Sequence, residues 1–183
     1  PPATTPSATN KKPKKKPAKK PKKKRKKRLK KKSPLRKRNE RAPIVAAMNP
    51  IHDHNRAAWD ARVQRGQRFT VVATDDEMSR PLEILDPLGW LGGDVTDKRI
   101  LCLGAGGGRH GPMLANAGAR VTVVDISPEM LRLDNELAEA RGLQVETVAT
   151  SIDDLSMLPA AEYDAVMQPV STCYVPDIRI AYR

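Results

Sequence analysis

The stretch from Ile100 to Ser127 restricts the fold more than any other part of this chain. A short apolar run enters a cluster of four glycines, a segment of helix length follows, and a second apolar run over residues 121–124 ends on Asp125. This order predicts a β-α-β unit with a glycine-rich loop after its first strand. Glycines let a ligand approach main-chain N–H groups without a Cβ in the way, and a terminal acid can accept both hydroxyls of a ribose. The unit therefore predicts a site for an adenosine-bearing ligand.

The same alternation of strand and helix continues along the chain. We expect strands over about residues 99–103, 120–124, 144–149 and 163–167, with helices over about 108–117 and 128–141. The alternation predicts right-handed crossovers and a parallel sheet. Strands that are unbroken apolar runs indicate helices on both faces of that sheet. We therefore expect an α/β fold with a doubly wound, mostly parallel sheet.

Two helices carry clear end signals. Ser127 followed by Pro128 predicts the capped start of one helix, and Gly142 predicts its end. A last helix is expected to start near Pro176 or Asp177. These signals indicate where the second crossover begins and ends.

The segment before the first strand has a less regular pattern. Residues 49–59 predict a helix with Asn55 or Asp53 as its N-cap. Over residues 62–96 we expect irregular or short-helical chain, with Pro81 as one of its breakers. This part is expected to lie outside the central sheet.

Charge divides the chain into two unlike pieces. Residues 1–47 hold 16 Lys, 5 Arg and one acid, whereas residues 48–183 hold 13 basic and 20 acidic residues, so that +20 and −7 add up to the net charge of +13. Like charges and repeated prolines predict a disordered arm over residues 1–47. Such an arm would bind polyanions, so non-specific nucleic acid binding through residues 11–41 is one hypothesis.

A second interpretation of the arm stays open. The chain opens on Pro1, and its first methionine, Met48, stands at the break in composition. The folded protein proper is therefore expected to begin at Met48, with the arm as an extension or an upstream artefact. The expected organisation is a basic arm over 1–47, a helical lid segment over 48–98 and a partial binding domain over 99–183.

The cysteines and the apolar runs exclude several classes of protein. Cys102 and Cys173 form no CxxC or Cys/His cluster, so neither a disulfide framework nor a metal site is expected. No apolar run approaches the roughly 18 residues of a membrane span, and the basic N-terminus lacks the apolar core of a secretory signal. We expect a soluble, cytoplasmic protein without a membrane partner.

The spacing of the glycines separates two classes of adenosine site. A dinucleotide loop has the pattern G-x-G-x-x-G, but Arg109 occupies its third glycine position, and the observed pattern is G-x-G-x-G over residues 104–108. With the segments DISPEML, SIDDL and YDAVMQPVSTCYVPD in order, the chain resembles class I S-adenosylmethionine-dependent methyltransferases of the type 11 and 25 kind. The resemblance covers roughly residues 55–177. It implies a Rossmann-like fold and S-adenosylmethionine as cofactor.

The resemblance also implies which residues hold the cofactor. Gly104, Ala105 and Gly106 would form the backbone cradle around its methionine part, and Gly108 would let the following helix pack closely. Asp125 would take the ribose hydroxyls.

Further residues are implied around the adenine and the sulfur. Ile126 would lie beside the adenine, Ser151 and Ile152 along its edge, and Gln168 would face the methyl-bearing sulfur. The N-terminal helix around Asn55 and Trp59 would contribute to a lid; no catalytic residue is assigned, and the histidines His52, His54 and His110 are candidates by type alone.

Three departures from the family pattern limit what can be transferred. Cys102 stands where many members carry an acid, and Thr150-Ser151 stand where a Gly-Asp pair is common. The chain is also expected to lack the last three strands of the usual seven, which would leave the strand over 163–167 as an exposed apolar edge.

The leading hypothesis is a methyltransferase that acts on a small-molecule acceptor. A nucleic-acid methyltransferase docked by the basic arm is the first alternative. A non-catalytic fragment, with a polyanion-binding arm on an S-adenosylmethionine fold, is the second.

Overall fold

The computed structural model describes residues 49–182, and every structural statement below concerns this part of the chain. The predictions of a disordered arm and of polyanion binding lie outside the described residues. The elements are α1 (Pro50–Gln64), α2 (Asp75–Ser79), α3 (Pro81–Leu85), β1 (Arg99–Leu103), α4 (His110–Asn116), β2 (Arg120–Asp125), α5 (Pro128–Arg141), β3 (Val145–Ala149), β4 (Ala165–Met167), the 3-10 helix η1 (Ser171–Tyr174) and α6 (Ile178–Ala181). No helix among them is long and apolar enough to cross a membrane.

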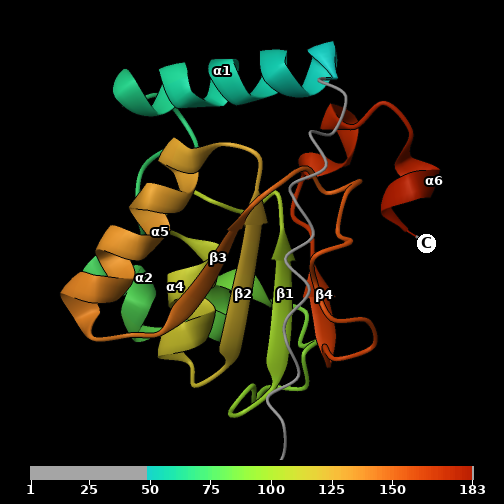
Figure 1. Ribbon diagram of the computed structural model, residues 1–183. Coiled ribbons are helices and arrows are strands. Elements are labelled where there is room, and N and C mark those ends of the chain that lie inside the picture. Colours follow the sequence, from blue (N-terminus) through green and yellow to red (C-terminus); the bar gives the residue numbers. More distant parts are fainter. Residues whose placement is uncertain (1–48, 183) are drawn as a thin grey trace, which may run out of the picture. The chain divides into compact units, whose positions relative to one another are not determined.

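Four parallel strands form the sheet, in the order β3-β2-β1-β4. In register, Cys102 on β1 lies opposite Val123 on β2 and Met167 on β4. The chain winds outward from β1 to β3 and then returns to place β4 on the other side of β1, as Figure 1 shows. This is the predicted doubly wound α/β topology, and the reversal of strand order is where such folds bind ligands.

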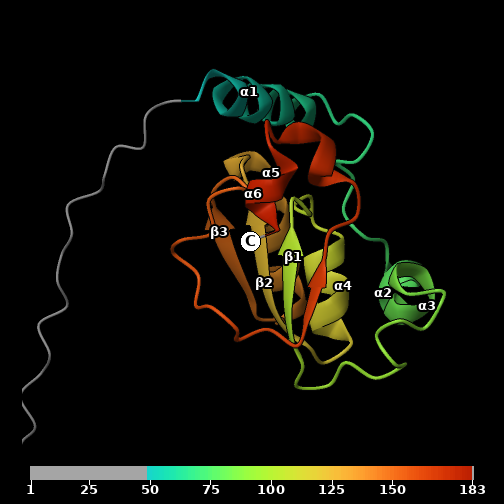
Figure 2. The same ribbon diagram turned by 90° about the vertical axis from the view of Figure 1, so that its right-hand side faces the viewer.

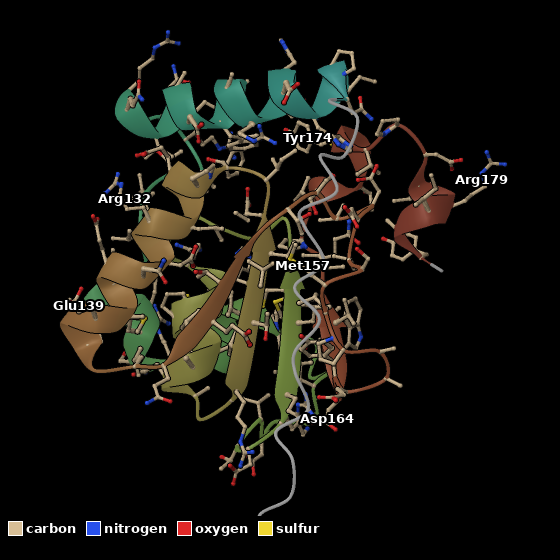
Figure 3. All side chains as sticks on the ribbon, viewed as in Figure 1. Arg132, Glu139, Met157, Asp164, Tyr174 and Arg179 are labelled. Atoms are coloured by element: carbon tan, nitrogen blue, oxygen red, sulfur yellow. The ribbon has the colours of Figure 1, made fainter. Side chains whose placement is uncertain are left out.

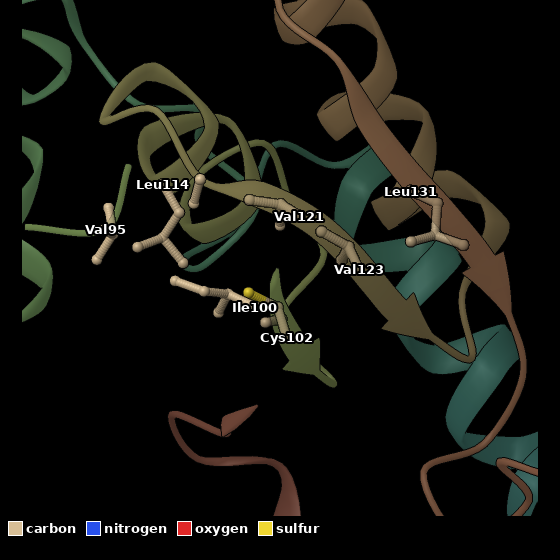
Figure 4. Packing of buried hydrophobic residues seen from close by; sticks show 9 residues of the cluster. Val95, Ile100, Cys102, Leu114, Val121, Val123 and Leu131 are labelled. Atoms are coloured by element: carbon tan, nitrogen blue, oxygen red, sulfur yellow. The ribbon is translucent and has the colours of Figure 1, made fainter. Parts of the chain in front are cut away.

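Alternate residues of the central strands face two different cores. Ile100 and Cys102 of β1 pack with Val121 and Val123 of β2 and with Leu114 of α4 (Figure 4). The period of two in the strands therefore separates the sheet into two buried faces.

The second face is covered differently from the first. Leu101 and Leu103 pack there with Val124 and with Ile152 of the chain between β3 and β4. This return crossover contains no helix, although both faces were expected to carry helices. Its apolar side chains cover the part of this face formed by β1 and β2.

The strand β4 lies at the edge of the described sheet, as expected. It is shorter than the predicted 163–167, and just before it Asp164 contacts Arg99: Asp164 Oδ2 accepts the Arg99 N–H at 2.7 Å, and the Asp164 N–H donates to the Arg99 carbonyl oxygen at 2.8 Å. The side chain of Val166 is 58% exposed on the outer face. One face of β4 thus lacks a cover within the described residues.

The residues predicted to begin and end α5 are confirmed, whereas the N-cap predicted for α1 is wrong. Ser127 Oγ accepts from the Met130 N–H, and Gly142 ends α5 in the left-handed conformation with φ of 64°. The N-cap of α1 is Asn49, not Asn55 or Asp53, because Pro50 at the first helical position starts the helix earlier.

Two further expectations concern where short helices begin. Pro81 separates α2 from α3, as expected, and begins α3, since a proline at the first helical position loses no hydrogen bond. The last helix begins after Asp177, whose side chain accepts the Arg179 N–H, in agreement with the predicted start.

Candidate functional site

A cavity of about 540 Å³ opens at the carboxyl ends of the strands. Its walls come from the loop after β1, the end of β2, the turn after β3 and residues 169–175 after β4. The helix α1 lies above the same ends of the strands in both Figure 1 and Figure 2. This volume is in the range of small-molecule sites, about 300–1,000 Å³.

The glycine loop forms the floor of the cavity. Gly104 has φ of 55°, and a Cβ built there would lie 2.3 Å from Ser171 Cβ. A Cβ on Gly106 would lie 2.9 Å from Met130 Cβ and 3.0 Å from Asp125 Oδ2. Both positions therefore require glycine, because the space that a Cβ would take is already filled by side chains of the protein.

Asp125, at the end of β2, is the buried acid of the site. Its Oδ2 accepts the Gly106 N–H at 3.0 Å, and its Oδ1 accepts the Ser127 N–H at 2.9 Å. Burial raises the pKa of this carboxyl, although the backbone hydrogen bonds act in the opposite direction. A carboxylate offers about four lone-pair sites, so two remain for ligand hydroxyls.

The structure brings seven of the nine residues assigned from the resemblance to this cavity. They are Gly104, Ala105, Gly106, Asp125, Ile126, Ser151 and Ile152. Because these residues come from three different loops, only the parallel register of β1, β2 and β3 brings them together.

The other two residues lie outside the cavity lining. A Cβ on Gly108 would lie 2.5 Å from Val72 Cγ1 and 3.0 Å from the Leu133 carbonyl oxygen, so this glycine permits close packing against α5. Gln168 Oε1 accepts a hydrogen bond from Tyr182 Oη at 2.7 Å. In this structure Gln168 is thus directed to α6, and its role toward the sulfur stays a prediction.

Polar contacts hold α1 over the cavity. Asn55 Nδ2 donates to the Tyr174 carbonyl oxygen at 2.8 Å, and the Trp59 and Tyr174 rings meet edge to face with centroids 5.6 Å apart. Figure 3 shows Tyr174 directly beneath the helix. At the other end of α1, Ser127 Oγ donates to Asp60 Oδ1 at 2.5 Å. The helix therefore closes the cavity without burying any residue completely.

Sequence reasoning missed a second group of lining residues. Arg68, Phe69 and Val71 line the cavity from the segment between α1 and α2. Phe69 has φ of 73°, a conformation uncommon for a residue with a Cβ, and its ring is 63% exposed beneath the Arg68 guanidinium. No motif marks this segment, because its place at the mouth depends on how α1 turns back.

Of the three histidines, only His110 lines the cavity. Burial, assisted by the positive charge of Arg109, lowers the pKa of His110 to about 4, so its imidazole is neutral at pH 7. His52 instead lies 3.1 Å from Asp153 Oδ2 and 3.3 Å from Ser151 Oγ, where it joins α1 to the turn after β3. His54 is exposed and lies outside the lining.

The fold is a Rossmann-like α/β domain, and the candidate site lies at the switch point of its sheet, where such folds bind nucleotides. Comparison with known families adds that residues 100–183 match the model of a methyltransferase domain. Over this range the chain resembles the class I S-adenosylmethionine-dependent methyltransferases.

Individual relatives agree with this family. The chain is 34% identical over 142 residues to the methyltransferase YbaJ of Bacillus subtilis, which covers 72% of this chain and 55% of the relative. It is 31% identical over 120 residues to the ubiquinone biosynthesis O-methyltransferase of Bordetella pertussis, covering 61% of this chain and 50% of the relative. The chain therefore spans about half the length of these curated relatives.

A solved structure supports the fold. The magnesium protoporphyrin IX methyltransferase of Synechocystis PCC 6803, solved with bound S-adenosylmethionine, superposes with a TM-score of 0.54 at 20% identity. The match covers 74% of this chain and 69% of that one. At this identity the likeness establishes the shared fold.

The residues present fit this family's cofactor. Gly104 and Gly106 line the cavity without a side chain of their own, and Asp125 is a buried acid with no salt-bridge partner among the described residues. Buried carboxylates favour a ligand that brings hydroxyl donors and positive charge. S-adenosylmethionine has both.

Proposed function

We propose that this chain binds S-adenosylmethionine in the cavity and acts in methyl transfer to a small-molecule acceptor. The observation that carries the proposal is that the glycine loop and Asp125 line the same cavity. They are joined there by a hydrogen bond, in which Asp125 Oδ2 accepts the Gly106 N–H at 3.0 Å. When bound, S-adenosylmethionine supplies a methyl group on a positively charged sulfur.

The residues of the chain have three tasks in this reaction. Asp125 orients the ribose, and the loop from Gly104 to Gly106 receives the methionine part. Trp59 and Tyr174 cover the cavity and exclude water, which favours a displacement that depends mainly on positioning. In the transfer, a bond forms between an acceptor atom and the methyl carbon while the bond from that carbon to sulfur breaks.

No catalytic base is assigned. The neutral His110 imidazole lines the cavity, but a pKa of about 4 makes it a weak proton acceptor at pH 7. A base is also dispensable for acceptors that ionise by themselves. The apolar side chains at the mouth, Phe69, Val71 and Val170, favour an acceptor with an apolar body.

Isothermal titration calorimetry of the 183-residue chain with S-adenosylmethionine and with NAD tests this function. We expect binding of S-adenosylmethionine alone, weakened at least about tenfold in Asp125→Ala, since hydrogen bonds to a charged group contribute about 1.5–3 kcal/mol. Asp154→Ala is a matched control, because Asp154 is exposed and lies outside the lining. Binding of NAD without S-adenosylmethionine would overturn the proposal.

The basic residues at 11–41 support a second, separate proposal, non-specific binding of nucleic acid. This segment holds all 16 Lys and 5 Arg of the first 47 residues. Binding through such a segment falls steeply with salt, because counterions are released from the phosphates. A chain that starts at Met48 should lose this affinity and keep the binding of S-adenosylmethionine.

A further inference from the structure

A second buried acid lies behind the glycine loop. Asp134 of α5 is fully buried, and its Oδ2 accepts the Gly107 N–H at 2.9 Å. Its Oδ1 is also buried and has no hydrogen-bond partner in the described part of the chain. Burying a carboxyl group in this position costs free energy, and a function of the group there would account for that cost.

Within residues 49–182, no cation contributes to the electrostatics of Asp134. Among residues 49–182, Cys102 and Asp125 interact electrostatically with Asp134, and the two further titratable groups Arg109 and His110 follow the glycine loop in the sequence. Arg109, the permanent cation among these four, is directed to Glu77 Oε1 at 2.6 Å. Burial keeps the Cys102 thiol and the His110 imidazole neutral near pH 7, with pKa values of about 12 and about 4. The negative charge of Asp134 is therefore left without a partner.

Burial, together with repulsion from Asp125, raises the pKa of Asp134 to about 7, although the Gly107 and Gly108 N–H groups favour its charged form. The two acids thus interact electrostatically, and Asp125 lines the cavity. A positive charge in the cavity would stabilise both.

We propose that Asp134 is a positioning residue, which holds the glycine loop through the Gly107 N–H and favours the positively charged S-adenosylmethionine over its neutral product S-adenosylhomocysteine. This inference rests on the proposed function. The two ligands differ by the methyl group and the positive charge on the sulfur. A negative charge behind the loop therefore raises the affinity for one ligand over the other, whereas contacts to the ribose and the adenine are the same for both. The same charge difference promotes exchange of the product for fresh cofactor.

The proposal predicts a specific pH dependence. A cation binds best when Asp134 is ionised, so its affinity should rise with pH until the pH exceeds the pKa of the free protein, and then level off. S-adenosylhomocysteine makes the same ribose contact to Asp125 and therefore serves as an internal reference. The ratio of the two affinities isolates the effect of charge.

The test is calorimetric titration of the 183-residue chain with both ligands from pH 5.5 to pH 8. In the wild type we expect the preference for S-adenosylmethionine to rise about 3- to 10-fold over this range, as for charges about 10 Å apart at an effective dielectric constant of about 20 to 40. Asp134→Asn should lose most of this rise. Glu139→Gln removes an equal charge from the outer side of α5 (Figure 3) and should keep it.

The outcomes are distinguishable. A flat ratio in the wild type, or an equal rise in Asp134→Asn, would overturn the role of Asp134 while the proposed function stands. If neither ligand binds the wild type, the proposed function itself fails, and this inference with it. Should Asp134→Asn not fold, the Gly107 amide resonance of the wild type decides, because its pH midpoint must fall when S-adenosylmethionine binds and stay unmoved with S-adenosylhomocysteine.

Discussion

The Oδ2 atom of Asp125 accepts the Gly106 N–H at 3.0 Å, so the acid at the end of β2 is joined to the loop that follows β1. The two residues are 19 positions apart in the chain. Their contact depends on the parallel pairing of β1 with β2, in which Leu103 lies opposite Val124. It also leaves no room between them for a side chain at position 106.

Gly106→Ala is therefore expected to damage the site. The added Cβ would lie 2.9 Å from Met130 Cβ and 3.0 Å from Asp125 Oδ2, so the loop or the acid must move. We expect at least about a tenfold loss of affinity for S-adenosylmethionine by calorimetry, equivalent to about 1.4 kcal/mol. Gly142→Ala is the control: it strains a helix end with no atom within 4 Å and should lower stability by about 1 kcal/mol with unchanged binding.

Trp59 should report closure of the cavity. The chain has two tryptophans, of which Trp59 lines the cavity while Trp90 is 84% exposed. In Trp90→Phe, addition of S-adenosylmethionine should change the intensity and wavelength of the fluorescence emission, because the ligand displaces water from the Trp59 ring. The response should vanish in Trp59→Phe, and a response carried by Trp90 would contradict the described position of α1.

Asp134 should also make stability depend on pH. Its folded-state pKa of about 7 exceeds the usual value of 3.8, so the folded state binds the proton more tightly, and this contribution to stability is lost as pH rises toward 7. Relative to the wild type, Asp134→Asn should gain about 2–3 kcal/mol in free energy of unfolding between pH 5 and pH 8. Urea denaturation at several pH values measures this, and a difference that is constant with pH would exclude a titrating Asp134.

The two cysteines should differ sharply in reactivity. Cys102 is fully buried, and its burial, together with a smaller repulsion from Asp134, raises the pKa of its thiol to about 12. Cys173, in contrast, is exposed. Because the thiolate is the reactive form, one thiol per chain should react with Ellman's reagent at pH 8, and both after denaturation. Cys173→Ser should leave the folded chain unreactive, and rapid labelling of Cys102 would contradict the packed core around β1.

Much of the cavity lining could be predicted because its parts are local. The glycine spacing over 104–108 and the acid at 125 each follow a strand within a few residues, so their place follows once the strands are found. Phe69 and Tyr174 could not be assigned this way, since nothing near them in the chain indicates that they meet the same cavity. The place of Gln168 after β4 could be predicted, but the direction of its side chain could not, because it depends on the contact with Tyr182.

Residue pattern alone thus determined the α/β class, the glycine loop and the ends of α5, because these depend on backbone conformation, alternation and capping within short stretches. The tertiary structure decided that α1 closes the cavity, that a helix-free crossover covers the second face, and that Asp134 lies behind the loop without a cation. A hydrophobic period indicates that a side chain is buried. Which neighbours it meets, and whether its charge is compensated there, depends on contacts between residues far apart in the chain.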